Sequence, residues 1–224
     1  MKKELDYVEV LYDEKLKPFT DYPKKLSNFI FNTNNMKARD KIIELGCGRG
    51  EFLKGFIDNG FIGYGVDQSD IAKQICPTAT VKITNIQENK LPFKNNFFDY
   101  IFSKSVIEHF YYPEEILKEC YRVLKPGGKI ITMCPSWEYN YKIYFEDYTH
   151  RTPFMLSSLR DLHIINNFKD VEVNYFRQLP FIWNYPFMII FTEFCRIFMP
   201  QFVNKYSKLV RFSKEVMLIA VAVK

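Results

Sequence analysis

The sequence predicts an α/β domain of the Rossmann-like type, built on a largely parallel sheet. Short apolar runs of strand length alternate with stretches of helical periodicity, a pattern typical of βαβ units. A glycine turn, Gly46-Cys47-Gly48-Arg49-Gly50, directly follows the first of these runs. A chain of 224 residues is long enough to bury a substantial core. We therefore expect a single domain over residues 1–224.

The elements are expected in the following order. An irregular lead-in and a helix over 21–37 make up residues 1–37. The core, residues 38–134, is expected to hold strands at 41–45, 62–66, 80–84, 98–103 and 129–134, and helices at 51–59, 70–75 and 113–124. The segment LKPGGK is expected to break the chain before the strand at 129–134. An acceptor-side loop over 135–153 precedes the last expected elements, which are a helix at 155–166 and strands at 169–177 and 214–223.

Residues 180–212 form an unusually aromatic insert. A structureless loop of this length is rare in a compact domain, so one or two helices are expected. Two interpretations stay open. The insert is either a lid packed on the domain or an interfacial element that touches a membrane through 180–214. The basic residues that would meet anionic headgroups are Lys205, Lys208, Arg211 and Lys214.

Composition narrows the function classes. The formal net charge of +5 and the lack of a basic stripe argue against a nucleic-acid partner. Five widely spaced cysteines without a C-x-x-C pair indicate reduced thiols rather than a disulfide framework or a zinc site. The N-terminus, MKKELDYVEV, lacks the apolar region of a signal peptide. A cytoplasmic protein is expected, located at the inner face of the membrane if the insert is interfacial.

The glycine turn indicates a nucleoside cofactor. Glycines permit a tight turn and let a ligand approach the main chain, and ligands bind at the carboxyl ends of parallel strands. Asp67 ends the second strand, where a carboxylate can accept hydrogen bonds from ribose hydroxyls. NAD-binding proteins share this feature. An ordinary αβ turn, with Asp67 capping the next helix, is the plainer alternative.

Three segments then resemble class I S-adenosylmethionine-dependent methyltransferases. They are ELGCGRG, NIQENKLPFKNNFFDYIFSKSVIEHF and YRVLKPGGKIITMCP. The resemblance is strong over residues 40–135 and looser over 150–223. It implies a seven-stranded mixed sheet with an antiparallel last strand and helices on both faces. It also implies that S-adenosylmethionine is the cofactor and S-adenosylhomocysteine the product.

The same resemblance implies a cofactor-binding role for individual residues. The residues that line the methionine portion of the cofactor are Glu44, Gly46, Cys47, Gly48 and Gly50. Asp67 matches the acidic ribose ligand, and Gln68 flanks the adenine. Asn85 stands where the family usually has Asp, and its side-chain oxygen can still accept a bond from the adenine amino group. Ile86 is expected to pack on the adenine, and Ser103 to face the sulfonium.

The candidates for a general base are drawn from three histidines. His109 follows the fourth strand and is either structural or catalytic. His150 lies in the stretch FEDYTHRTPF, which resembles bacterial methyltransferases associated with surface polysaccharides and sugar acceptors. Asp147 is expected to orient His150, unless this loop merely caps the next helix. His163 is expected to be structural. A metal site of Glu146, Asp147 and His150 has no diagnostic spacing, so no metal is predicted.

The predicted activity is methyl transfer to a small-molecule acceptor, most simply a hydroxyl of a sugar or glycan precursor in polysaccharide biosynthesis. The alternatives are a lipid or quinone-like acceptor, a methyltransferase-like binding protein without catalysis, and an NAD-dependent oxidoreductase. The oligomeric state stays open.

Overall fold

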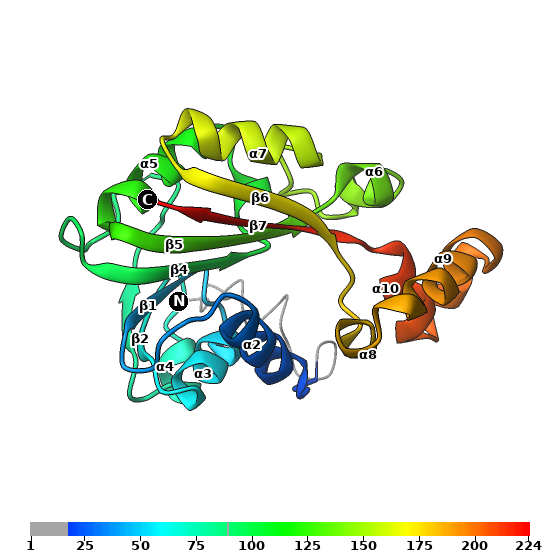
Figure 1. Ribbon diagram of the computed structural model, residues 1–224, viewed down its shortest axis with the longest axis horizontal. Helices are drawn as coiled ribbons and strands as arrows, with labels where there is room; N and C mark the ends of the chain where they lie inside the picture. The colour runs from blue at the N-terminus through cyan, green and yellow to red at the C-terminus, as the bar shows by residue number, and fades with distance from the viewer. Residues whose placement is uncertain (1–17, 89) are drawn as a thin grey trace, which may run out of the picture. The chain divides into compact units, whose positions relative to one another are not determined.

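The computed structural model describes residues 18–88 and 90–224 and contains a seven-stranded sheet of order β3-β2-β1-β4-β5-β7-β6 (Figure 1). The strands are β1 (Lys41–Leu45), β2 (Ile62–Asp67), β3 (Thr80–Ile83), β4 (Phe98–Lys104), β5 (Leu124–Pro135), β6 (Lys169–Phe176) and β7 (Met217–Val223). The pairs β1–β2 and β2–β3 are parallel, whereas β6 and β7 are antiparallel. The predicted Rossmann-like mixed sheet with an antiparallel last strand is thus confirmed.

Two compact units make up the chain. The first comprises the described residues up to Phe102 together with Arg122–Lys129, and the second comprises Ser103–Tyr121 and Ile130–Lys224. Strands β4 and β5 contribute residues to both units. The prediction of one domain over residues 1–224 stays a prediction.

In the first unit, two amphipathic helices form one layer of the core. Helix α2 (Tyr22–Thr33) packs on α3 (Glu51–Asp58), and α3 also contacts β1 and β2 (Figure 1). Leu26 of α2 and Phe56 of α3 are fully buried, as their helical spacing predicts. A Cβ atom at Gly55 would lie 2.5 Å from Oγ of Ser27, so the helices approach closely because this position is glycine. The short helix α4 (Ala72–Ile75) follows β2.

In the second unit, helix α7 (Leu156–Ile165) contacts β6 and β7 (Figure 1). The one-turn helix η1 (Ile107–His109) and helix α5 (Pro113–Val123) follow β4. The insert between β6 and β7 is helical, as predicted, and gathers beyond the end of β6 (Figure 1). Its segments are α8 (Pro180–Asn184), η3 (Pro186–Met188), α9 (Ile189–Phe198), η4 (Gln201–Lys205) and α10 (Lys208–Lys214). Among the described helices, none has both the length and the apolar character needed to cross a bilayer.

Several boundaries differ from the sequence predictions, and one of them is the start of the last strand, which lies at Met217 rather than at residue 214. The segment LKPGGK is not a break, because β5 already begins at Leu124, directly after α5. Backbone pairing accounts for this: the Phe97 N–H donates to the Val123 carbonyl directly before the segment, and β5 lies between β4 and β7 in the sheet. Gly127 has a φ of 77°, a left-handed conformation that glycine adopts readily. The expected loop at 135–153 contains helices α6 (Trp137–Asn140) and η2 (Tyr144–Glu146). The first helix ends at Thr33. Residues 1–17 of the expected lead-in lie outside the described residues.

Candidate cofactor and acceptor sites

The glycine turn after β1 has the backbone conformation that its sequence predicts. Gly46, Gly48 and Gly50 all have positive φ angles, of 62°, 49° and 81°. Residues other than glycine rarely adopt such angles. Gly50 starts α3 and donates from its N–H to the Cys47 carbonyl at 2.7 Å. A Cβ atom at Gly48 would meet nothing within 4 Å. Open space therefore lies beside the backbone of Gly48, where a ligand can approach the main chain.

Asp67 ties the end of β2 to this turn. Its Oδ2 accepts a hydrogen bond of 2.7 Å from the Gly48 N–H, and its Oδ1 accepts one of 3.0 Å from the Ser69 N–H. The alternative that Asp67 caps the following helix is wrong, because the N-cap of α4 is Ile71. The carboxylate is 4% exposed and lies at the carboxyl end of a parallel strand. This is the position at which it can meet a ribose.

Cys47 anchors the glycine turn through its backbone and its buried side chain. Its N–H donates to the Val66 carbonyl at 3.1 Å, and its side chain lies in an apolar cluster with Leu53, Ala72 and Cys76. Burial raises the pKa of the Cys47 thiol, with a further rise from the nearby charge of Glu44. The side chain therefore packs as a small apolar group rather than serving as a nucleophile.

The other predicted cofactor residues occupy the expected elements. Glu44 is buried on β1, and Gln68 is exposed directly after β2. Asn85 and Ile86 are half-buried after β3. The side-chain oxygen of Asn85 accepts a bond of 3.1 Å from the Gln87 N–H. An amide oxygen has two lone pairs and can accept more than one hydrogen bond. Ser103 is buried on β4 and belongs to the second unit. The cofactor contacts of these residues stay predictions.

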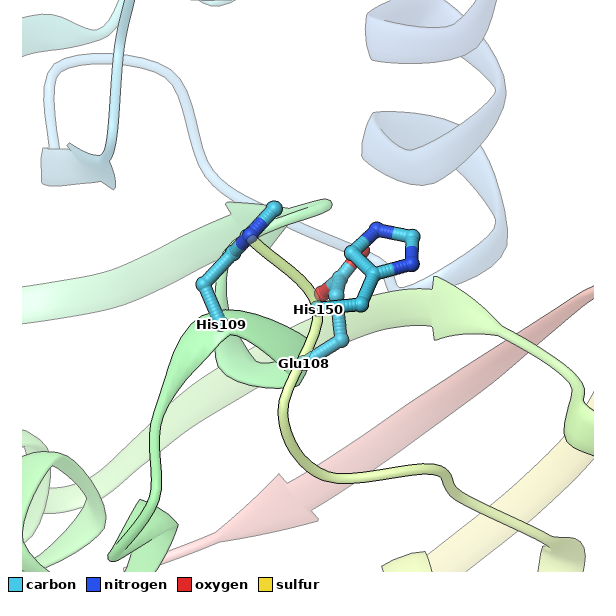
Figure 2. A group of neighbouring side chains, drawn as sticks. All are labelled: Glu108, His109 and His150. Atoms are coloured by element: carbon cyan, nitrogen blue, oxygen red, sulfur yellow. The ribbon is translucent and has the colours of Figure 1, made fainter. Parts of the chain in front are cut away.

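In the second unit, three side chains from two distant segments converge (Figure 2). Glu108 and His109 come from η1, and His150 comes from the loop that follows η2. One potential ligand atom of each lies within 4.8 Å of the others. The two imidazole rings are 4.9 Å apart between centroids.

Backbone hydrogen bonds hold these two segments together. The Glu108 carbonyl accepts bonds from the N–H groups of Arg151 at 2.8 Å and Thr152 at 3.0 Å. The Thr152 hydroxyl donates to the Phe110 carbonyl at 2.6 Å. The Tyr144 hydroxyl in turn donates to the Thr152 carbonyl at 2.7 Å. These bonds tie the loop to η1 on one side and to η2 on the other.

Hydrogen bonds also define the orientation of each imidazole. Nδ1 of His150 lies 2.6 Å from the Tyr144 carbonyl, which can only accept, so Nδ1 carries the proton. The Thr149 hydroxyl donates to Asp147, so its oxygen accepts from Nδ1 of His109 at 2.9 Å. With Nδ1 as the donor in each ring, the lone pair of the corresponding uncharged tautomer lies on Nε2. Asp147 approaches His150 only loosely, with 3.9 Å between Oδ2 and Nε2. Asp147 therefore orients His109, through Thr149, more directly than it orients His150.

Charge and burial shape the cluster. Burial raises the pKa of Glu108 to about 8, although Lys104 and the backbone N–H groups of Glu108 and Val106 oppose this electrostatically. Burial and the neighbouring His150 lower the pKa of His109. Burial acts to raise the pKa of Asp147, but hydrogen bonds from Thr149 outweigh it and the net shift is downward. At neutral pH His109 is therefore an uncharged imidazole that can bind a proton or an ion.

The sequence predicts no individual role for Glu108, Thr149 or Tyr144, although Thr149 lies in the stretch FEDYTHRTPF. Glu108 belongs, beside His109, to one of the segments that carry the family resemblance. Its meeting with His150 depends on the tertiary structure. Among the described residues, the carboxylate that lies beside two histidines is Glu108, whereas Glu146 of the metal site considered from the sequence is exposed. Arg151 is bound within its own loop, donating to the carbonyls of Tyr148 and His150. His163 is structural, as expected: it is buried, with Nδ1 2.8 Å from the Leu159 carbonyl.

Part of the chain is similar in sequence to known proteins. A family model described as a methyltransferase domain matches residues 43–132. The chain is 37% identical over 89 residues to an uncharacterized protein of Methanocaldococcus jannaschii, covering 40% of this chain and 42% of that protein. It is 26% identical over 120 residues to the ubiquinone/menaquinone biosynthesis C-methyltransferase of Neisseria meningitidis, covering 47% of each. The chain spans less than half the length of these two curated relatives.

A solved structure extends the similarity to the whole fold. The SAM-dependent methyltransferase from Archaeoglobus fulgidus matches 98% of this chain and 100% of its own, with a TM-score of 0.70 and 18% sequence identity. Together with the strand order, this similarity shows the architecture of the chain. The chain therefore has the class I methyltransferase fold, and its residues 43–132 match the methyltransferase-domain family.

Proposed function

We propose that the chain transfers a methyl group from S-adenosylmethionine to a hydroxyl oxygen of a small molecule. The cofactor assignment rests on the glycine turn, on Asp67 and on the match of residues 43–132 to the methyltransferase-domain family. The acceptor assignment rests on one observation. The His150 imidazole is fixed at Nδ1 by the Tyr144 carbonyl and carries its lone pair on Nε2, beside His109.

The chemistry explains why such a cluster matters. The sulfonium is already an activated donor, so the protein mainly aligns acceptor oxygen, methyl carbon and sulfur. A hydroxyl must also lose its proton. As that proton leaves, an oxygen lone pair forms the bond to the methyl carbon, and the carbon–sulfur bond breaks with its electron pair on sulfur. The products are a methyl ether, S-adenosylhomocysteine and one proton. An imidazole cluster promotes the loss of that proton.

A sugar or glycan precursor is the first candidate acceptor. The stretch around Asp147 and His150 supports it, because it resembles methyltransferases associated with polysaccharides. A sugar hydroxyl is poorly acidic and needs activation. Arg151 gives no further support, since its guanidinium donates to carbonyls of its own loop and lies over the Tyr111 ring.

A lipid or quinone-like acceptor is the second candidate, and the insert favours it. Six large apolar side chains of η3 and α9 are exposed at helical spacing: Phe187, Ile190, Phe191, Phe194, Ile197 and Phe198. Exposed apolar patches of this kind mark partner, ligand or membrane contacts. The match to a C-methyltransferase of ubiquinone and menaquinone biosynthesis is consistent with an apolar acceptor.

The deciding experiment compares His150→Ala with wild type. Methyl transfer from labelled S-adenosylmethionine is measured against sugar nucleotides, glycan precursors, quinols and phospholipids. On the acceptor that wild type uses, we expect turnover to fall at least about 100-fold, while calorimetry shows unchanged cofactor affinity. His163→Gln, which alters a buried histidine outside the cluster, is the control. A fully active His150→Ala protein would exclude the cluster from the reaction. If calorimetry detects binding of NAD but not of S-adenosylmethionine, the chain is an oxidoreductase instead. If S-adenosylmethionine binds but no acceptor is methylated, the chain is a binding protein.

A further inference from the structure

We propose that Glu108, His109 and His150 form a binding site for one divalent transition-metal ion. The inference deepens the proposed function by naming what activates the acceptor hydroxyl, and that catalytic part rests on the proposed function. The binding of the ion rests on the geometry alone. The sequence predicted no metal, because the ligands lie on two segments that only the fold brings together (Figure 2).

The possible ligand atoms of the three side chains converge on one point. One ligand atom from each of the three residues lies within 4.8 Å of the others. Ligands that share an ion at 2.0–2.2 Å stand about 3–4 Å apart, so small side-chain adjustments close the site. The hydrogen bonds from Arg151 and Thr152 to the Glu108 carbonyl already fix the two segments. The ion would therefore bind a preformed arrangement.

The Glu108 carboxyl group is buried without a compensating hydrogen bond. Its side chain is 0% exposed, and neither carboxyl oxygen has a hydrogen-bond partner of ordinary geometry. A buried polar group without a partner is rare and costs free energy comparable to a lost hydrogen bond. A cation coordinated by the carboxylate would supply the missing interaction and compensate for its burial.

Hydrogen bonds at Nδ1 orient both histidine rings. Nδ1 of His150 donates to the Tyr144 carbonyl, and Nδ1 of His109 donates to Thr149. Thr149 passes the interaction on to Asp147. Metal-binding histidines commonly donate their second nitrogen to a carbonyl or, directly or through a hydroxyl, to a carboxylate, which fixes the tautomer that offers its lone pair to the ion. Both rings here have such a partner.

The ligand set indicates the kind of ion. Two imidazoles and one carboxylate suit Zn²⁺, Mn²⁺, Fe²⁺ or Co²⁺, whereas Mg²⁺ and Ca²⁺ prefer oxygen ligands alone. Three protein ligands leave coordination positions open, as in catalytic rather than structural sites. An acceptor hydroxyl that occupies an open position becomes more acidic and releases its proton to solvent near neutral pH. The oxygen then attacks the methyl group as described above.

Metal binding is tested on the full chain, purified without a histidine tag and stripped with a chelator. Titration with Co²⁺ is followed by its visible absorption, and titration with Zn²⁺ by calorimetry. Wild type should bind one ion per chain. His150→Ala and Glu108→Gln should each weaken binding at least tenfold. His163→Gln, which changes a histidine outside the cluster, should bind like wild type. Equal binding by wild type and His150→Ala would overturn the site.

Two further measurements keep the outcome interpretable. Thermal melts establish that Glu108→Gln is folded, and His150→Ala serves in its place if it is not, since His150 lies in a partly exposed loop. Asp147→Asn should retain the ion, because Asp147 is not one of the proposed ligands and reaches His109 only through Thr149. Loss of Co²⁺ absorption in Asp147→Asn with retention in Glu108→Gln would move the site away from Glu108 and reject the proposal.

The catalytic part has separate outcomes. If the stripped protein loses methyl transfer to a hydroxyl acceptor and Zn²⁺ or Mn²⁺ restores it, the ion activates the acceptor. If a metal-free protein transfers methyl groups at the full rate, the proposed function stands and the metal's catalytic role is rejected. If the ion binds but no hydroxyl acceptor is methylated, the site stands and the proposed function fails.

Discussion

The backbone N–H of Gly48 donates a hydrogen bond of 2.7 Å to Oδ2 of Asp67, which lies 19 residues further along the chain. This bond joins the glycine turn to the end of β2, so the two predicted parts of the cofactor site are one structural unit. Asp67→Asn removes the charge and one good acceptor. We expect affinity for S-adenosylmethionine to fall at least about tenfold, because a bond to a charged acceptor contributes about 1.5–3 kcal/mol. Calorimetry measures the change, and an unaltered affinity would place the ribose elsewhere.

The space beside Gly48 allows a matched pair of variants. Gly48 and Gly127 have positive φ angles of 49° and 77°, and a Cβ at either would meet nothing within 4 Å. Gly48→Ala and Gly127→Ala should therefore cost similar stability, about 1–2 kcal/mol each, from backbone strain alone. Only Gly48→Ala should weaken cofactor binding, because its methyl group enters the space that the ligand needs. Equal affinities in the two variants would contradict a cofactor at Gly48.

His163 predicts how stability depends on pH. Burial lowers the pKa of His163 below its ordinary value of 6.5. The folded protein thus keeps the ring neutral while the unfolded chain takes up a proton. Stability from this group is complete above pH 6.5 and is lost as the pH falls below it.

Melting temperatures at pH 7.5 and 5.5 measure this loss. Wild type should lose more than His163→Gln over this interval, by roughly 2–4 °C for each kcal/mol of difference. The variant is less stable at both pH values, because it also loses the contact of the ring with Phe168 and the bond to Thr132. An identical drop in the two proteins would mean that His163 is protonated in the folded state.

The exposed face of the insert predicts binding to lipid vesicles. Ile190 of α9 is 74% exposed within the aromatic face, whereas Ile165 at the end of α7 is 75% exposed outside it. Ile190→Asp should abolish co-sedimentation with phosphatidylglycerol vesicles, and Ile165→Asp should leave it unchanged. Absence of binding by wild type would favour the lid interpretation.

Salt should weaken this binding only modestly. Of the basic residues expected to meet headgroups, Lys208 and Arg211 are exposed. Arg211 pairs with Glu215 at 2.9 Å, and Lys214 donates to the Met199 carbonyl at 2.6 Å. The side chain of Lys205 lies outside the described part of the chain. Apolar burial rather than charge would then carry the contact, and a steep loss at moderate salt would contradict this.

Most of the fold could be predicted from local patterns. The strands at 41–45 and 62–67, the glycine turn and the helix after it depend on apolar periodicity and on the few residues that tolerate a positive φ, all of which are visible in neighbouring residues. The segment LKPGGK could not be predicted in this way. Its glycines and proline favour a turn, but pairing of β5 with its neighbours overrides that preference, since hydrogen bonds across a sheet depend on distant residues.

The sequence predicts the cofactor site, because a strand, a glycine turn and a carboxylate at a strand end are short-range features. The cluster of Glu108, His109 and His150, in contrast, depends on the tertiary structure. Glu108 and His150 lie on separate segments, and backbone bonds between those segments bring the carboxylate and the two imidazoles together. Which groups surround a buried carboxylate depends on how distant segments of the chain fold together, so no local sequence pattern predicts them.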